Sequence, residues 1–181
     1  FQQLRSQLSD NEDIDGLAPQ VAESVPAVDL TTRLSEGRMN VVGLDPAFMS
    51  GFDGFKLPSG EEVVLEDLAQ GEAYLNGEAA RELEAVAGHD IRLFIEDEPI
   101  TLTVRAVVSK GGLAGRGPTL IVPLDLAQAI FGKTGQINNI VVSNRGDQTS
   151  GAELSKAVTK DLRVIFNDRD KASELRDLLN R

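Results

Sequence analysis

The sequence contains no cysteine and no tryptophan, and it has a single tyrosine and a single histidine in 181 residues. Without cysteine the chain can form no disulfide framework, no thiolate metal site and no cysteine nucleophile. One imidazole also excludes a histidine-rich metal site. No apolar run approaches the ~20 residues that a membrane helix requires. Because aromatic residues are scarce, we expect the core to consist mainly of Val, Leu, Ile and Ala.

Positive charge is also scarce. The chain has 18 Lys and Arg residues against 29 Asp and Glu residues, which gives a formal net charge of −11. The basic residues form no stripe, and binding to DNA or RNA requires one because phosphate neutralisation supplies most of the affinity. The same charge disfavours a free-standing binder of anionic membranes. We therefore predict no nucleic-acid partner.

The composition otherwise matches a folded domain, with 41% hydrophobic and 26% charged residues. A chain of this length can form one large domain or two small ones. It begins with Phe1 and has neither an initiating Met nor the apolar region of a signal peptide. We expect it to be a segment of a longer protein.

Hydrophobic periodicity predicts alternating helices and strands. The expected helices are 1–9, 17–25, 77–86, 123–131, 151–162 and 168–180. The expected strands are 27–34, 38–44, 73–75, 91–95, 100–108, 119–122, 137–143 and 164–166. A helix followed by a strand near 17–34 and again near 151–166 indicates one α/β unit, built from both chain ends, with a second unit inserted between them.

Three motifs suggest chemistry only weakly. Gly132-Lys133-Thr134 has Ala127 where a phosphate-binding loop needs glycine, so we interpret Gly132 as a helix C-cap. His89 lies in a turn, and no Gly-x-Ser-x-Gly segment presents a serine to it. Acidic pairs are frequent and are expected on a solvated face. We predict no catalytic residue, no metal site and no cofactor.

The glycine-rich segment 111–117 has no dinucleotide-binding spacing and leads into a strand rather than a helix. We expect a mobile surface loop here, and loops often make functional contacts. Gly112, Leu113 and Arg116 are the residues predicted to contact a partner.

The order of motifs along residues 40–143 is more informative than any single motif. A strand ends in Gly-x-Asp-Pro, an Asn-led helix and a Gly-x-Asp turn follow, and Val-Pro-Leu opens a later helix. We expect Asn76 to cap the helix that follows it. The segments concerned are Val41–Pro46, Ala73–Ala80, Gly88–Ile91, Leu102–Val108, Leu120–Gln128 and Gln136–Val142. This order resembles the extracytoplasmic (periplasmic core) domain of MacB/FtsX-type ABC transporter permeases.

The resemblance implies a mixed α/β (α+β) fold in two parts. A porter-like α/β subdomain would comprise residues 1–44 and 137–181, and a strand-rich subdomain, residues 45–136, would be inserted in it. It also implies a location at the cell membrane, on the extracytoplasmic side. The implied partners are the membrane helices of the parent permease, a separate cytoplasmic ATPase subunit, and an extracellular client protein, peptide or lipid.

The function that follows is non-catalytic: the domain would couple movement of membrane helices to an extracellular substrate or partner. The main alternative is a secreted or surface-anchored protein-binding module without a transport role. A further alternative is a hydrolase, which would require two facing carboxylates with raised pKa values in a cleft. The sequence leaves the transported substance open.

Overall fold

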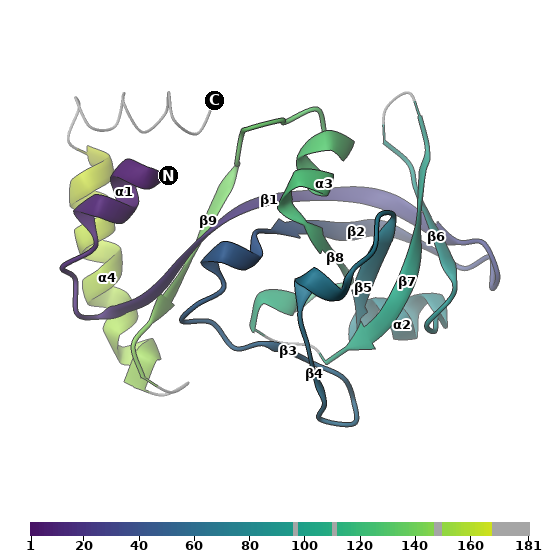
Figure 1. Ribbon diagram of the computed structural model, residues 1–181, viewed down its shortest axis with the longest axis horizontal. Coiled ribbons are helices and arrows are strands. Elements are labelled where there is room, and N and C mark those ends of the chain that lie inside the picture. The colour runs from purple at the N-terminus through teal and green to yellow at the C-terminus, as the bar shows by residue number, and fades with distance from the viewer. Residues whose placement is uncertain (96–97, 110–111, 147–149, 168–181) are drawn as a thin grey trace.

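The computed structural model describes residues 1–95, 98–109, 112–146 and 150–167 (Figure 1). Its helices are α1 (Gln2–Gln7), α2 (Gly77–Leu83), α3 (Leu124–Ile130) and α4 (Ser150–Asn167), with short 3₁₀ turns η1 (Pro46–Phe48), η2 (Leu65–Asp67) and η3 (Gly112–Ala114). Its strands are β1 (Ile14–Asp29), β2 (Ser35–Leu44), β3 (Phe55–Lys56), β4 (Glu62–Val63), β5 (Glu72–Asn76), β6 (Asp90–Leu93), β7 (Ile100–Val108), β8 (Thr119–Pro123) and β9 (Asn139–Asn144).

One seven-stranded sheet organises the molecule, in the order β2-β8-β5-β7-β6-β1-β9. Because β1 also pairs with β2, the strands of this sheet other than β9 form a closed ring of pairings, while β3 and β4 pair only with each other. The pairings β2–β8 and β5–β7 are parallel, whereas β1–β2, β1–β6, β1–β9, β5–β8 and β6–β7 are antiparallel. The predicted mixed α/β fold class is confirmed.

Alternate residues of the ring strands point to opposite sides, as the two-residue period of a strand requires. One side supplies a core in which α2 and α3 also take part, formed by residues that include Val21, Met39, Leu75, Ile91, Val104 and Leu120. The other side supplies a second core, which the segment after β2 covers, with Leu44, Phe55, Leu65, Tyr74 and Ile121 among its residues. As expected from the scarcity of aromatic residues, both cores consist mainly of aliphatic side chains.

Several predicted elements are confirmed. Strand β7 has the predicted bounds, Ile100–Val108, and parts of the predicted strands 27–34 and 38–44 pair as β1 and β2. The chain reverses at 30–34, however, so these residues form a turn and not the predicted strand, and 35–37 belong to β2. Pro123 directly precedes α3, and Gly132 follows it with a φ of +62°, the left-handed conformation of a helix C-cap.

The prediction of a helix at 17–25 is wrong, because these residues belong to the long strand β1. Leu17, Val21 and Val25 have helical spacing, yet they pair with β9 and β2, whose partners lie far away in the sequence. Tertiary pairing has overridden the local pattern.

The predicted strand 164–166 is also wrong, since these residues continue α4. The predicted repeat of a helix followed by a strand is therefore absent from the described residues near both 17–34 and 151–166. The predicted helix 168–180 lies outside the described residues.

Candidate functional site

Helices α1 and α4 lie side by side at one end of the molecule, next to β9 (Figure 1). Leu4 of α1 and Leu8, which directly follows the helix, are buried, and Leu162 and Ile165 of α4 pack against them. A six-residue helix such as α1 is too short to be stable alone in water, so its packing against α4 maintains it. The first residues of the chain and the last described turn of α4 are thereby brought together.

Strand β1 connects this helix pair with the opposite end of the molecule (Figure 1). Its first part, residues 14–20, pairs with β9; residues 20–28 pair with β2, and residues 27–29 pair with β6. At about 3.3 Å per residue its 16 residues span about 50 Å. One strand therefore joins the terminal helices directly to the far turn of the sheet.

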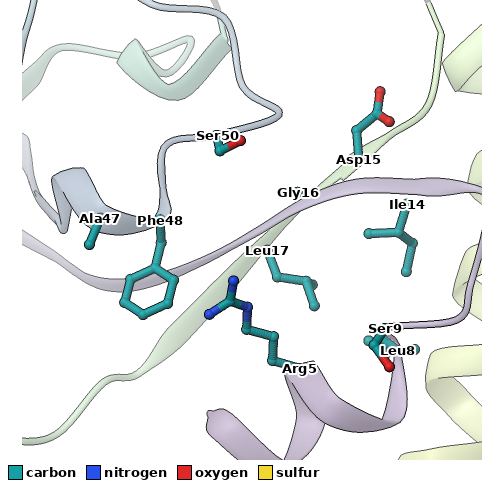
Figure 2. Close-up of a pocket in the computed structure, with 10 residues that line it drawn as sticks. All are labelled: Arg5, Leu8, Ser9, Ile14, Asp15, Gly16, Leu17, Ala47, Phe48 and Ser50. Carbon is teal, nitrogen blue, oxygen red and sulfur yellow. The ribbon is translucent and has the colours of Figure 1, made fainter.

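A second contact joins α1 to the segment after β2, across a cavity of about 320 Å³ (Figure 2). The ring of Phe48 in η1 meets the ring of Phe1 edge-on, with centroids 5.0 Å apart. The guanidinium of Arg5 lies 5.2 Å from the centroid of the same ring. The geometry is that of a cation–π contact. Asp45 fixes η1 because its carboxylate accepts a hydrogen bond from the Ala47 amide at 2.9 Å.

Two glycines allow the backbone of β1 to touch the same segment. A Cβ on Gly51 would lie 2.3 Å from the carbonyl oxygen of Asp15, and Gly51 has a φ of +85°. A Cβ on Gly16 would lie 2.7 Å from the carbonyl oxygen of Ser50. Only glycine fits where two backbones approach so closely. The Phe48 contacts and this glycine crossing together form what we call the α1 junction.

At the far end of β1, a buried carboxylate shapes the turn into β2. Asp29 is fully buried, and its carboxylate accepts hydrogen bonds from the amides of Thr31 and Thr32 at 2.7 and 3.0 Å. Its other oxygen lies 2.7 Å from Nδ1 of His89. Burial by itself would raise the pKa of Asp29, but the His89 contact and the two backbone amides lower it below its ordinary value. His89 therefore anchors the turn.

The predicted partner-contact loop is held by a buried asparagine. Asn76 donates to the carbonyl oxygens of Ala114 and Gly117 at 2.9 and 2.8 Å, and its own side-chain oxygen accepts from the amides of Ala79 and Thr119. The same side chain thus caps α2, as the sequence predicted, and fixes the loop.

Of the three loop residues predicted to contact a partner, Leu113 packs into the second core and Arg116 is exposed. Gly112 begins η3. Any partner contact through this loop would therefore involve Arg116 rather than the leucine side chain, and the contact itself stays a prediction.

A hydrolytic site with paired carboxylates finds no support in the described part of the chain. Asp29 is the only buried carboxylate there, its partner is a histidine, and its pKa is lowered, whereas an acid catalyst needs a raised value. Within the same residues no three His, Cys, Asp or Glu side chains gather as a metal site would require. No described helix has the length and apolarity to cross a membrane.

Sequence reasoning missed the α1 junction and the Asp29–His89 pair. The residues of each contact lie far apart in the chain, and neither pair belongs to a motif. Gly16 and Gly51 offered the only signal, since an isolated glycine beside a strand can mark a close backbone approach.

Comparison with known proteins adds evidence on the fold alone. No protein-family model and no curated protein matches the chain. A solved structure of the extracellular domain of the noncanonic ABC-type transporter YknZ, from Gram-positive bacteria, is similar with a TM-score of 0.52 and 15% identity, over 84% of this chain and 74% of that one. The periplasmic region of MacB from Actinobacillus actinomycetemcomitans is similar with a TM-score of 0.51 and 20% identity, over 87% and 71% of the respective chains.

Proposed function

We propose that this chain is the extracytoplasmic domain of an ABC-type transporter permease, and that it couples movement of membrane helices to an extracellular client. The chain has the fold of two extracytoplasmic transporter domains, YknZ and MacB, over most of its length. The observation that carries the proposal is the continuous path from the α1–α4 pair along β1 to the turn at Asp29.

In this proposal α1 and α4 are the connections to the membrane. Helices that lie together can be displaced together. A strand transmits a displacement along its length because its backbone is already nearly fully extended. The α1 junction adds a second contact between α1 and the body of the domain. ATP would be hydrolysed by a separate cytoplasmic subunit, so the domain needs no catalytic residue.

The division into a terminal part, 1–44 and 137–181, and an inserted part, 45–136, stays part of the proposal. What supports it is that elements from both ends of the chain pack together: α1 and the start of β1 with β9 and α4. The inserted part supplies β5 to β8, which complete the ring of strands with β1 and β2.

The proposal is tested with the parent protein purified in detergent together with its ATPase. Phe48→Ala removes the ring that both Phe1 and Arg5 contact. We expect a severalfold change in the rate of ATP hydrolysis, with assembly unchanged. Val64→Ala is the matched control, because that side chain is 51% exposed.

Failure of the parent protein to associate with an ATPase would overturn the transporter assignment and favour a surface-anchored binding module. Equal hydrolysis by Phe48→Ala and by the wild type, within a competent complex, would overturn the coupling role of the α1 junction while leaving the transporter assignment intact.

A further inference from the structure

The ring of strands has a seam where β1 and β6 separate. The two strands pair only over residues 27–29 of β1, and β9 begins its pairing with β1 at Gln20. Between these stretches one edge of β1, residues 21–26, faces neither β9 nor β6. Figure 1 shows β9 and β6 on different stretches of the strand.

A groove of about 640 Å³ lies beside this seam. Its walls come from β1, from the β6–β7 hairpin and from the end of α3. Most of the residues that line it have apolar side chains, among them Val25, Phe94, Ile95, Ile100, Ile130 and Phe131, and Glu23, Glu98 and Lys133 add charged groups. Phe94 is 48% exposed, so a ligand in the groove can contact its ring.

The backbone amide and carbonyl of Ser24 point away from β2 and into this seam. Both backbone groups of Ala22 bond to the side chain of Asn138, and the carbonyl of Pro26 accepts from the Phe94 amide. Since alternate residues of a strand direct their backbone groups to the same side, the amide and carbonyl of Ser24 also face away from β2.

The partner of Ser24 in β2 confirms this direction. That partner is Asn40, whose amide donates to the carbonyl of Pro118 on the β8 side and is therefore directed away from β1. Ser24 and Asn40 thus form a non-hydrogen-bonded pair. Neither β6 nor β9 reaches Ser24, so among the described residues no strand pairs with its amide and carbonyl on this side, and Ser24 is exposed.

The contact at Ala22, two residues before Ser24, shows which group can pair with this edge of β1. The side-chain amide of Asn138 accepts from the Ala22 amide at 2.9 Å and donates to the Ala22 carbonyl at 3.0 Å. It takes the place that a peptide group of an adjacent strand would occupy. Two residues after Ser24, Pro26 has no backbone N–H that could donate a hydrogen bond. The open edge therefore suits about three residues of extended chain centred on Ser24.

The rim of the groove carries negative charge. Glu23 forms an ion pair with Lys133 at 3.3 Å, so these two charges balance. Glu98 is exposed and makes no ion pair within the described part of the chain. An occupant with a basic side chain would complement it.

We propose that this seam binds an extended peptide segment that pairs its main chain with Ser24, places apolar side chains against Phe94 and Phe131, and presents a basic residue to Glu98. This is strand addition at a sheet edge, in which main-chain hydrogen bonds give affinity and side-chain pockets give selectivity. The inference stands apart from the transport role, because it concerns binding by this chain alone.

The test is a titration of the 181-residue chain with a capped five-residue peptide of alternating lysine and valine, followed by calorimetry. Ser24→Pro removes the amide without removing a bond to β2, and we expect it to weaken binding about five- to tenfold. Ser24→Ala is the matched control: it removes the hydroxyl that donates to Asn40 at 2.7 Å, keeps the amide, and should bind within about twofold of the wild type.

A second peptide, N-methylated at its central amide, has the same charge and cannot pair. Equal binding of both peptides would show attraction to an acidic surface only and would overturn the proposal, as would equal binding by Ser24→Pro and Ser24→Ala. If circular dichroism shows Ser24→Pro to be unfolded, Phe94→Ser replaces it, and undiminished binding by that variant would likewise overturn the proposal.

Discussion

Replacing Gly51 by alanine should destabilise the chain because β1 and the segment after β2 touch at this residue. The new Cβ would lie 2.3 Å from the carbonyl oxygen of Asp15 and 2.6 Å from its carbonyl carbon, both of which are backbone atoms. Backbone cannot move aside as the end of a side chain can. Relief of the overlap would therefore displace the start of β1 from the segment 50–52.

The magnitude has two parts. Alanine at a φ of +85° costs about 1 kcal/mol, since L-residues disfavour the left-handed region. Overpacking adds about 1–3 kcal/mol. Gly60 separates the two parts, because it has a φ of +91° and nothing within 4 Å of a Cβ. Gly60→Ala should thus cost about 1 kcal/mol, and Gly51→Ala about 2–4 kcal/mol.

The assay is urea unfolding followed by far-ultraviolet circular dichroism, with the free energy of unfolding extrapolated to water. Both variants should unfold in one transition, and the dependence of the free energy of unfolding on urea concentration should equal that of the wild type. If the two alanine variants lost the same free energy within about 0.5 kcal/mol, the close approach at Gly51 would not exist in solution and the α1 junction would be wrong.

Three further predictions concern buried side chains. Asn76→Ala should lower the free energy of unfolding by about 3 kcal/mol, because it removes four hydrogen bonds, and should increase hydrogen exchange at the Thr119 amide. Stability that depends on the Asp29 carboxylate is present above its ordinary pKa of 3.8 and is lost as the pH falls through the lowered folded value; Asp29→Asn should remove this acid-dependent part in urea titrations between pH 7 and pH 3, and an unchanged profile would contradict it. Leu4→Ala should cost about 2–3 kcal/mol and increase exchange in α1 and α4 together, whereas a change confined to α1 would argue against their mutual packing.

Local signals were sufficient where an element is bounded by turn residues and buried on one face. Strand β7 alternates between buried and exposed positions, and the helix after Pro123 has a residue that presets its first turn. Asn76 was predicted as a cap because it stands directly before the helical pattern of α2.

The wrong predictions concern segments whose structure depends on contacts with residues far away in the sequence. Residues 18–21 are all buried, so the start of β1 shows no alternation, and its small and apolar residues also suit a helix. The Val-Ile-Phe run at 164–166 has high strand propensity, yet Ile165 packs against α1, some 160 residues away along the chain. The resemblance of motif order nevertheless predicted the fold correctly, because it reflects the whole arrangement rather than local preference.

The candidate functional features were harder to foresee. Asp29 and His89 lie 60 residues apart and belong to no motif, and the open edge at Ser24 depends on where two other strands end. Such features follow from topology, and no window of sequence contains them.

In the proposed function, nucleotide binding at a cytoplasmic ATPase moves this domain through α1, α4 and β1. Hydrogen exchange of the parent transporter complex, compared with and without a non-hydrolysable ATP analogue, tests it most directly. We expect altered exchange in α1, in α4 and at the segment 45–52, with unchanged protection in the strands β5, β7 and β8. Identical exchange throughout the domain in both states would contradict it.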